Sequence, residues 1–70
     1  MEKVVVYVFP LDFEVYKKIK ELMPDAAICQ GLGMSLEEVQ DSIRILQERL
    51  GVSTRLHVFR SDITVKPILM

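Results

Sequence analysis

The sequence predicts one small α+β domain, residues 1–70, in which three helices are followed by a C-terminal pair of strands and preceded by one further strand. Three observations point to this class. A chain of 70 residues has room for a single domain. Half of the residues are hydrophobic, which excludes a disordered segment. Their spacing is helical in the middle of the chain and has a period of two near the C-terminus.

The N-terminal strand is predicted over residues 4–9, where β-branched and aromatic residues follow one another without a charge. Such a strand is apolar on both faces, and a chain this short has few elements that could cover both. We therefore expect helices against one face and a second copy of the chain against the other. The expected assembly is a homodimer through this strand.

Two helices are predicted next. Asp12 is a candidate N-cap for the first, and Pro24 is expected to end it, because proline lacks the N–H that a helix needs. Asp25 is a candidate N-cap for the second helix, over residues 26–32. Gly33 lies just past its end, where a left-handed residue is favoured.

The third helix has the strongest local signals. Ser35 and Glu38 have the spacing of a capping box, and Gly51 is placed to end a helix over residues 36–50. Its apolar stripe has spacings of 4, 3 and 4 and consists of Val39, Ile43, Leu46 and Leu50.

The C-terminal segment is predicted to form a β-hairpin over residues 54–68. Apolar and polar side chains alternate on either side of Arg60–Asp62, which has the composition of a turn.

Residues 28–52 resemble the winged helix-turn-helix of small bacterial and archaeal transcription regulators, and are most similar to the leucine-responsive regulator family. The matching positions are a small residue, a glycine, a serine, two hydrophobic residues and a leucine-rich end, here Cys29, Gly33, Ser35, Val39, Ile43 and residues 46–52. The resemblance implies a helix at 26–32, a turn at 33–35, a recognition helix at 36–50 and a wing formed by the hairpin. The N-terminal strand departs from that scaffold, and could pair with the wing or form an intersubunit sheet.

The same resemblance implies a DNA-binding transcriptional regulator that contacts double-stranded DNA. Its recognition helix would enter the major groove, where arginine pairs with guanine and glutamine with adenine. Gln40 and Arg44 would provide sequence preference in this way. The residues expected to position the protein on DNA are Ser35 and, from the wing, Arg55, Arg60 and Lys66.

The charge distribution leaves an alternative open. The chain has nine Lys and Arg residues against ten Asp and Glu residues, and residues 35–50 carry two basic groups against four acidic ones. Because affinity for DNA comes largely from neutralised phosphates, an acidic recognition helix is a poor DNA binder. The alternative is a winged-helix adaptor that binds a protein partner and no DNA.

Other classes of function are not expected. Cys29 and His57 are the only thiol and the only imidazole, so no spacing typical of a metal site or a catalytic pair is present. We expect no enzymatic activity, no cofactor and no metal. A single cysteine favours a reducing compartment, and the apolar run from Val4 to Leu11 is far shorter than the ~20 residues that span a bilayer. The expected location is the cytoplasm, without a membrane partner.

Overall fold

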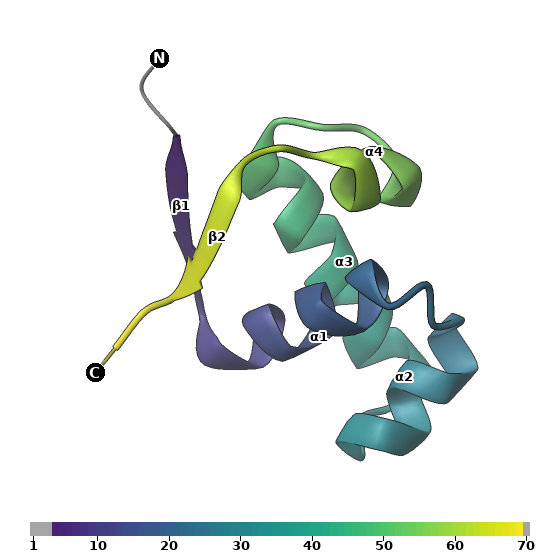
Figure 1. The fold of residues 1–70 in the computed structure, drawn as a ribbon. Helices are drawn as coiled ribbons and strands as arrows, with labels where there is room; N and C mark the ends of the chain where they lie inside the picture. The colour runs from purple at the N-terminus through teal and green to yellow at the C-terminus, as the bar shows by residue number, and fades with distance from the viewer. Residues whose placement is uncertain (1–3, 70) are drawn as a thin grey trace.

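The computed structural model describes residues 4–69 and confirms the α+β class. Figure 1 shows helices that pack together beside a small sheet at one end of the molecule. The elements in chain order are β1 (Val5–Val8), α1 (Pro10–Lys20), α2 (Asp25–Leu32), α3 (Leu36–Leu50), α4 (Arg55–Arg60) and β2 (Thr64–Pro67).

The middle of the chain folds as predicted. Helices α2 and α3 match the expected ranges, with α2 starting one residue earlier. Gly33 ends α2 in the left-handed conformation, at φ 65°. The capping box of α3 is present: the Glu38 N–H donates to the Ser35 hydroxyl at 3.2 Å, and the Ser35 N–H donates to the Glu38 carboxylate at 3.1 Å. Local signals thus determine where α3 begins.

Gly33 and Gly31 provide a matched pair for testing the turn. Neither added Cβ would meet an atom within 4 Å, but Gly33 has a positive φ and Gly31 lies within α2. Gly33→Ala is expected to lower the free energy of unfolding by about 1–2 kcal/mol through backbone strain. Gly31→Ala should raise it by about 0.5–1 kcal/mol through helix propensity. Urea unfolding measures both, and changes of the same sign would contradict the assigned backbone conformations.

Helix α1 starts and ends earlier than predicted. Phe9 is its N-cap and Pro10 its first residue, a position where the missing N–H of proline costs nothing. Asp12 is therefore not the N-cap. Its carboxylate is buried and accepts a 2.6 Å hydrogen bond from the Ser42 hydroxyl of α3, so it links two helices. The other end of α1 is at Lys20.

The connection between α1 and α2 also differs from the expectation. Leu22 has a positive φ of 60°, so the chain leaves the helix before it reaches Pro24. Pro24 occupies the N-cap position of α2, and Asp25 is the first helical residue. The predicted cap at Asp25 is wrong.

The predicted hairpin at 54–68 is also wrong, because its first half is a helix. The Thr54 side chain accepts a hydrogen bond from the His57 N–H at 3.2 Å and caps the start of α4. At the other end, the Lys20 ammonium donates to the carbonyls of Phe59 and Ser61 at 2.7 and 3.2 Å. The side chains of residues 55–60 alternate in a way that is compatible with a strand. The hydrogen bonds at the two ends of this segment favour a helix instead.

The second half of that segment is β2, which pairs with β1 in parallel (Figure 1). Val5 is opposite Thr64, and Val8 is opposite Pro67. The sequence left two placements open for the N-terminal strand, pairing with the wing or an intersubunit sheet. Within the chain, β1 pairs with the C-terminal segment, which contributes a single strand and no hairpin. A parallel pair needs a long crossover connection, and all four helices of residues 4–69 lie in it.

The core collects side chains from every element. Buried hydrophobic residues are Val8, Val15, Ile19, Ile28, Val39, Ile43, Leu46, Leu50, Val58 and Val65. One face of the sheet therefore packs against the helices, as expected for the N-terminal strand. On its other face the Tyr7 side chain is 54% exposed and lines a shallow hollow with Lys66, Pro67, Ile68 and Leu69.

Candidate nucleic-acid interface

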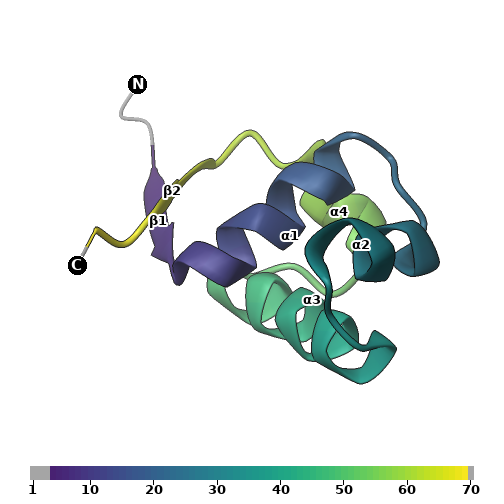
Figure 2. The ribbon, with the colours of Figure 1, turned by 90° about the horizontal axis from the view of Figure 1, so that it is seen from below.

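One side of α3 is uncovered along the helix. Figure 2 shows α1, α2 and α4 on a single side of α3, where its apolar stripe is buried. The opposite side is exposed and carries Glu37, Gln40, Asp41, Arg44 and Glu48, which we call the outer face of α3. A 15-residue helix is about 22 Å long and narrow enough for the major groove of DNA. The structure thus places Gln40 and Arg44 together on a surface that such a groove could receive.

Helix α2 and the turn hold the start of this surface. Ile28 is fully buried and anchors α2 to the core, while Leu32 and Met34 are partly buried around the turn. Ser35 is exposed and is the N-cap of α3. Its hydroxyl oxygen accepts from Glu38, which leaves the hydroxyl hydrogen able to donate to a phosphate.

The charge on the outer face is mostly negative, with three carboxylates against one guanidinium. That guanidinium is close to one of the carboxylates: Arg44 Nη2 lies 3.3 Å from Asp41 Oδ1. Both side chains are more than half exposed, so the pair is weak and Arg44 can exchange it for another acceptor. To contact DNA, the Arg44 guanidinium would have to leave its pair with Asp41.

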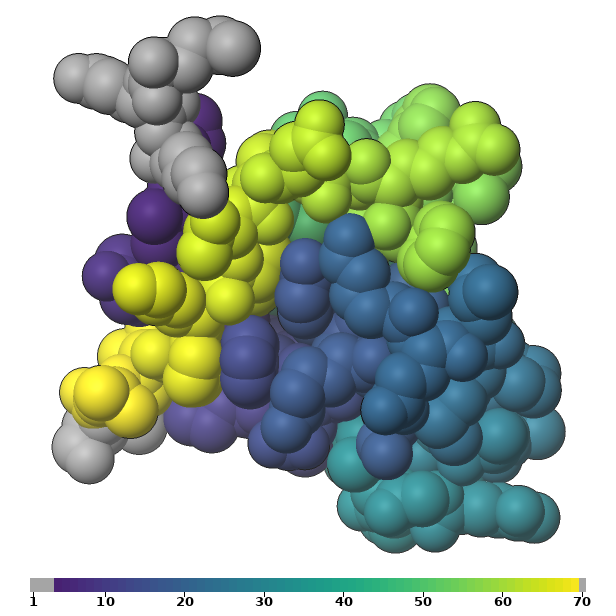
Figure 3. All heavy atoms as spheres, in the orientation of Figure 1, coloured from purple at the N-terminus to yellow at the C-terminus, as the bar shows by residue number. Residues whose placement is uncertain are grey.

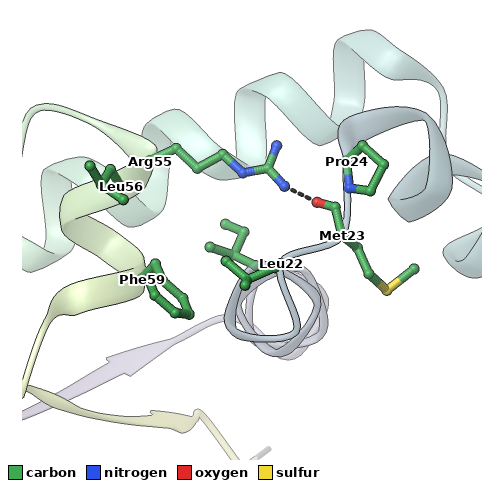
Figure 4. Close-up of a pocket in the computed structure, with 7 residues that line it drawn as sticks. Leu22, Met23, Pro24, Arg55, Leu56 and Phe59 are labelled. Atoms are coloured by element: carbon green, nitrogen blue, oxygen red, sulfur yellow. Dashed lines mark hydrogen bonds between the residues drawn. The ribbon is translucent and has the colours of Figure 1, made fainter.

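Arg55 has a structural role in the fold. Its guanidinium lies between helices, where it pairs with the Asp25 carboxylate and donates to the Met23 carbonyl. The second of these bonds is drawn in Figure 4. Arg55 is thus engaged within the protein and lies outside the outer face of α3.

The remaining two predicted contacts lie on other elements. Arg60 is the exposed last residue of α4, and Lys66 is exposed on β2, on the sheet face that points away from the helices. The wing that was expected to present them beside the recognition helix is not formed. The structure therefore places Gln40 and Arg44 on one exposed side of α3 and Ser35 at its N-terminal end, and puts Arg60 and Lys66 on other elements.

An apolar cleft of about 340 Å³ lies between the end of α1 and α4 (Figure 4). Sequence reasoning missed it because residues 55–60 were expected to form a strand. The available signal was Thr54, a good N-cap residue. Among residues 4–69, Arg55 is the one charged residue lining the cleft, and it is already paired with Asp25. The cleft is lined by Ile19, Leu22, Met23, Pro24, Arg55, Leu56 and Phe59.

Other chemistry near the interface is limited. Within residues 4–69, no group of three His, Cys, Asp or Glu side chains could hold a metal ion. In the same range no helix combines the length and the apolar character needed to cross a membrane. Burial raises the pKa of the Tyr16 phenol, which lies on α1 and not on the outer face of α3.

Comparisons with known proteins give no relative. The chain matches no protein-family model, and no curated protein or solved structure matches it significantly. Function is therefore inferred from the geometry and the charge of α3.

Proposed function

We propose that this protein is a DNA-binding transcriptional regulator that inserts the N-terminal half of α3 into the major groove. The observation that carries the proposal is the α2–turn–α3 arrangement with the outer face of α3 uncovered. In that docking Gln40 is placed to pair with adenine and Arg44 with guanine. Ser35 donates to a phosphate at the edge of the groove. The proposed unit is a helix-turn-helix supported by α1 and α4, without a wing.

The acidic residues of the outer face limit affinity. Phosphate neutralisation supplies most of the binding energy that is independent of sequence, and Glu37 and Asp41 oppose it. A single copy of α3 is therefore expected to bind random duplex DNA weakly, and the sites that it prefers should be those where Arg44 finds guanine.

The direct test is fluorescence anisotropy with a random-sequence duplex at about 50 and 200 mM salt. Because the outer face of α3 carries a single cation, affinity is expected to fall by no more than about tenfold between the two, which corresponds to at most about two neutralised phosphates. Absence of binding at the lower salt concentration would refute the proposal.

Asp41 and Asp62 test whether the outer face is the surface that meets DNA. Asp41→Asn removes a carboxylate from that face and releases Arg44 from its pair, so affinity is expected to rise by about three- to tenfold at low salt. Asp62→Asn makes the same change in net charge between α4 and β2. It is expected to change affinity by less than about twofold. Equal effects of the two substitutions in the anisotropy titration would show that only net charge matters.

A second candidate function is docking to a protein partner, without DNA. The observation that favours it is the excess of carboxylates on the outer face, which fits a basic protein surface. The two candidate functions predict opposite effects of one substitution. Asp41→Asn strengthens binding to DNA if the first is correct, and it weakens binding to a basic protein partner if the second is correct.

A further inference from the structure

The two edges of the sheet differ in their capacity to bind another strand. The Thr64 N–H donates to the Val4 carbonyl and the Ile68 N–H to the Val8 carbonyl. In a parallel pair with this register, backbone groups alternate between the partner strand and the outside. Those of Val5 and Tyr7 on β1 therefore point away from β2 and can accept a further strand.

The outer edge of β2 is blocked. By the same alternation, Val65 and Pro67 face outward on that side, and proline has no N–H to offer. Proline at an edge is one of the devices that prevent strand addition, and charged residues are another. The edge of β1 has neither, because residues 4–9 contain no proline and no charged residue.

We propose that β1 pairs antiparallel with β1 of a second copy of this chain, across a two-fold axis at Val6. Val5 is then opposite Tyr7 of the second copy, and Tyr7 is opposite its Val5. Two such pairs add about four backbone hydrogen bonds. The product is a four-stranded sheet in the order β2–β1–β1–β2, in which both edges of each β1 strand are paired.

The side chains at this edge complement themselves. On the exposed face, Val5 and Tyr7 are 40% and 54% exposed, and aromatic and β-branched residues form a favourable cross-strand pair. A strand from another protein would need a matching apolar pair, whereas a second copy supplies it by symmetry. The nearest exposed cations on β2, the two copies of Lys66, would be three strand spacings apart, about 14 Å. This exceeds the Debye length at physiological salt, so they repel little.

The size of the sheet also favours this pairing. The sheet has only two strands, and although one face packs against the helices, a four-stranded sheet would bury more of the other. Figure 3 shows the visible part of β1 at the margin of the molecule, with the C-terminal residues that follow β2 beside it. Pairing at the edge of β1 uses none of the residues of the outer face of α3.

The test measures mass and amide exchange without DNA, so it fails or succeeds independently of the proposed function. Light scattering at about 1–500 µM should show a concentration-dependent dimer. In the dimer, the Val5 and Tyr7 amides should exchange slowly with solvent, whereas the outward amide of Val65 should exchange fast at every concentration. A monomer throughout overturns the proposal. A dimer with fast-exchanging Val5 and Tyr7 amides also overturns it, since the contact then lies elsewhere.

Two variants separate edge pairing from general apolar association. Val5→Lys combined with Tyr7→Lys places charges on the edge strand and should raise the dissociation constant of the dimer by about tenfold or more. Both side chains are exposed in the single chain, so the fold should persist, as circular dichroism can verify. Leu22→Lys is the control. That side chain is apolar and 68% exposed, but it lies in the connection between α1 and α2 and not on the sheet. Equal loss of dimer in the control would contradict edge pairing.

Discussion

Leu46→Ala is expected to lower the free energy of unfolding by about 2–5 kcal/mol, the largest effect of any single substitution considered. Leu46 is fully buried on the inner side of α3, the helix that contacts α1, α2 and α4. Removal of its side chain leaves a cavity within the hydrophobic core. Total stabilities of domains are only about 5–15 kcal/mol, so a chain this small should be largely unfolded in mild urea.

The control for this prediction is on the same helix. Leu36→Ala makes the same chemical change where the side chain is 51% exposed, and should cost less than about 1 kcal/mol. Urea unfolding of both variants at one protein concentration gives the comparison. Similar losses would mean that α3 does not present Leu46 to the core.

Arg55→Met is expected to lower the free energy of unfolding by about 1.5–3 kcal/mol, the range for hydrogen bonds to a charged group. Arg55 joins the start of α4 to Asp25 at the start of α2 and to the Met23 carbonyl. Methionine keeps most of the apolar stem and removes the guanidinium. Because a six-residue helix is unstable alone, α4 depends on such contacts, and the loss should include faster exchange of α4 amides.

Two further variants show which part of this interaction matters. Asp25→Asn removes the ion pair but keeps the bond to Met23, so it should cost less than Arg55→Met. Arg60→Met removes an exposed arginine from the same helix and should change stability by less than about 0.5 kcal/mol. If Arg60→Met destabilises the chain as much as Arg55→Met does, the assigned role of Arg55 is wrong. Thermal unfolding followed by circular dichroism is sufficient for all three.

Local signals explain which parts of the fold could be predicted. Ser35 with Glu38 and the glycines at 33 and 51 fix the ends of α2 and α3 through contacts within a few residues of each other. Arg55–Arg60 has one local signal, the N-cap Thr54. Its helix depends on Lys20 and on Asp25, which are far away in the sequence, and the alternation of its side chains favoured a strand.

The same distinction applies to the sheet and to the candidate interface. The parallel pairing of β1 with β2 joins residues about sixty positions apart, and no short-range pattern encodes it. Asp12 is a residue type that often caps helices, which is why it was predicted to be an N-cap. Its carboxylate instead accepts a hydrogen bond from Ser42, which is thirty positions away in the sequence. Gln40 and Arg44 could be placed on one exposed side of α3 because helical periodicity determines that side. The engagement of Arg55 could not be anticipated, since it requires α4.

The measurement that tests the central claim most directly is an NMR titration of the labelled protein with a random-sequence duplex at about 50 mM salt. Shift changes are expected to concentrate at residues 35–44, with the Arg44 guanidinium among the largest, and to be small on α4 and β2. Changes confined to other elements, or none at all while the fold remains intact, would contradict the assignment of the outer face of α3 as a DNA-binding surface.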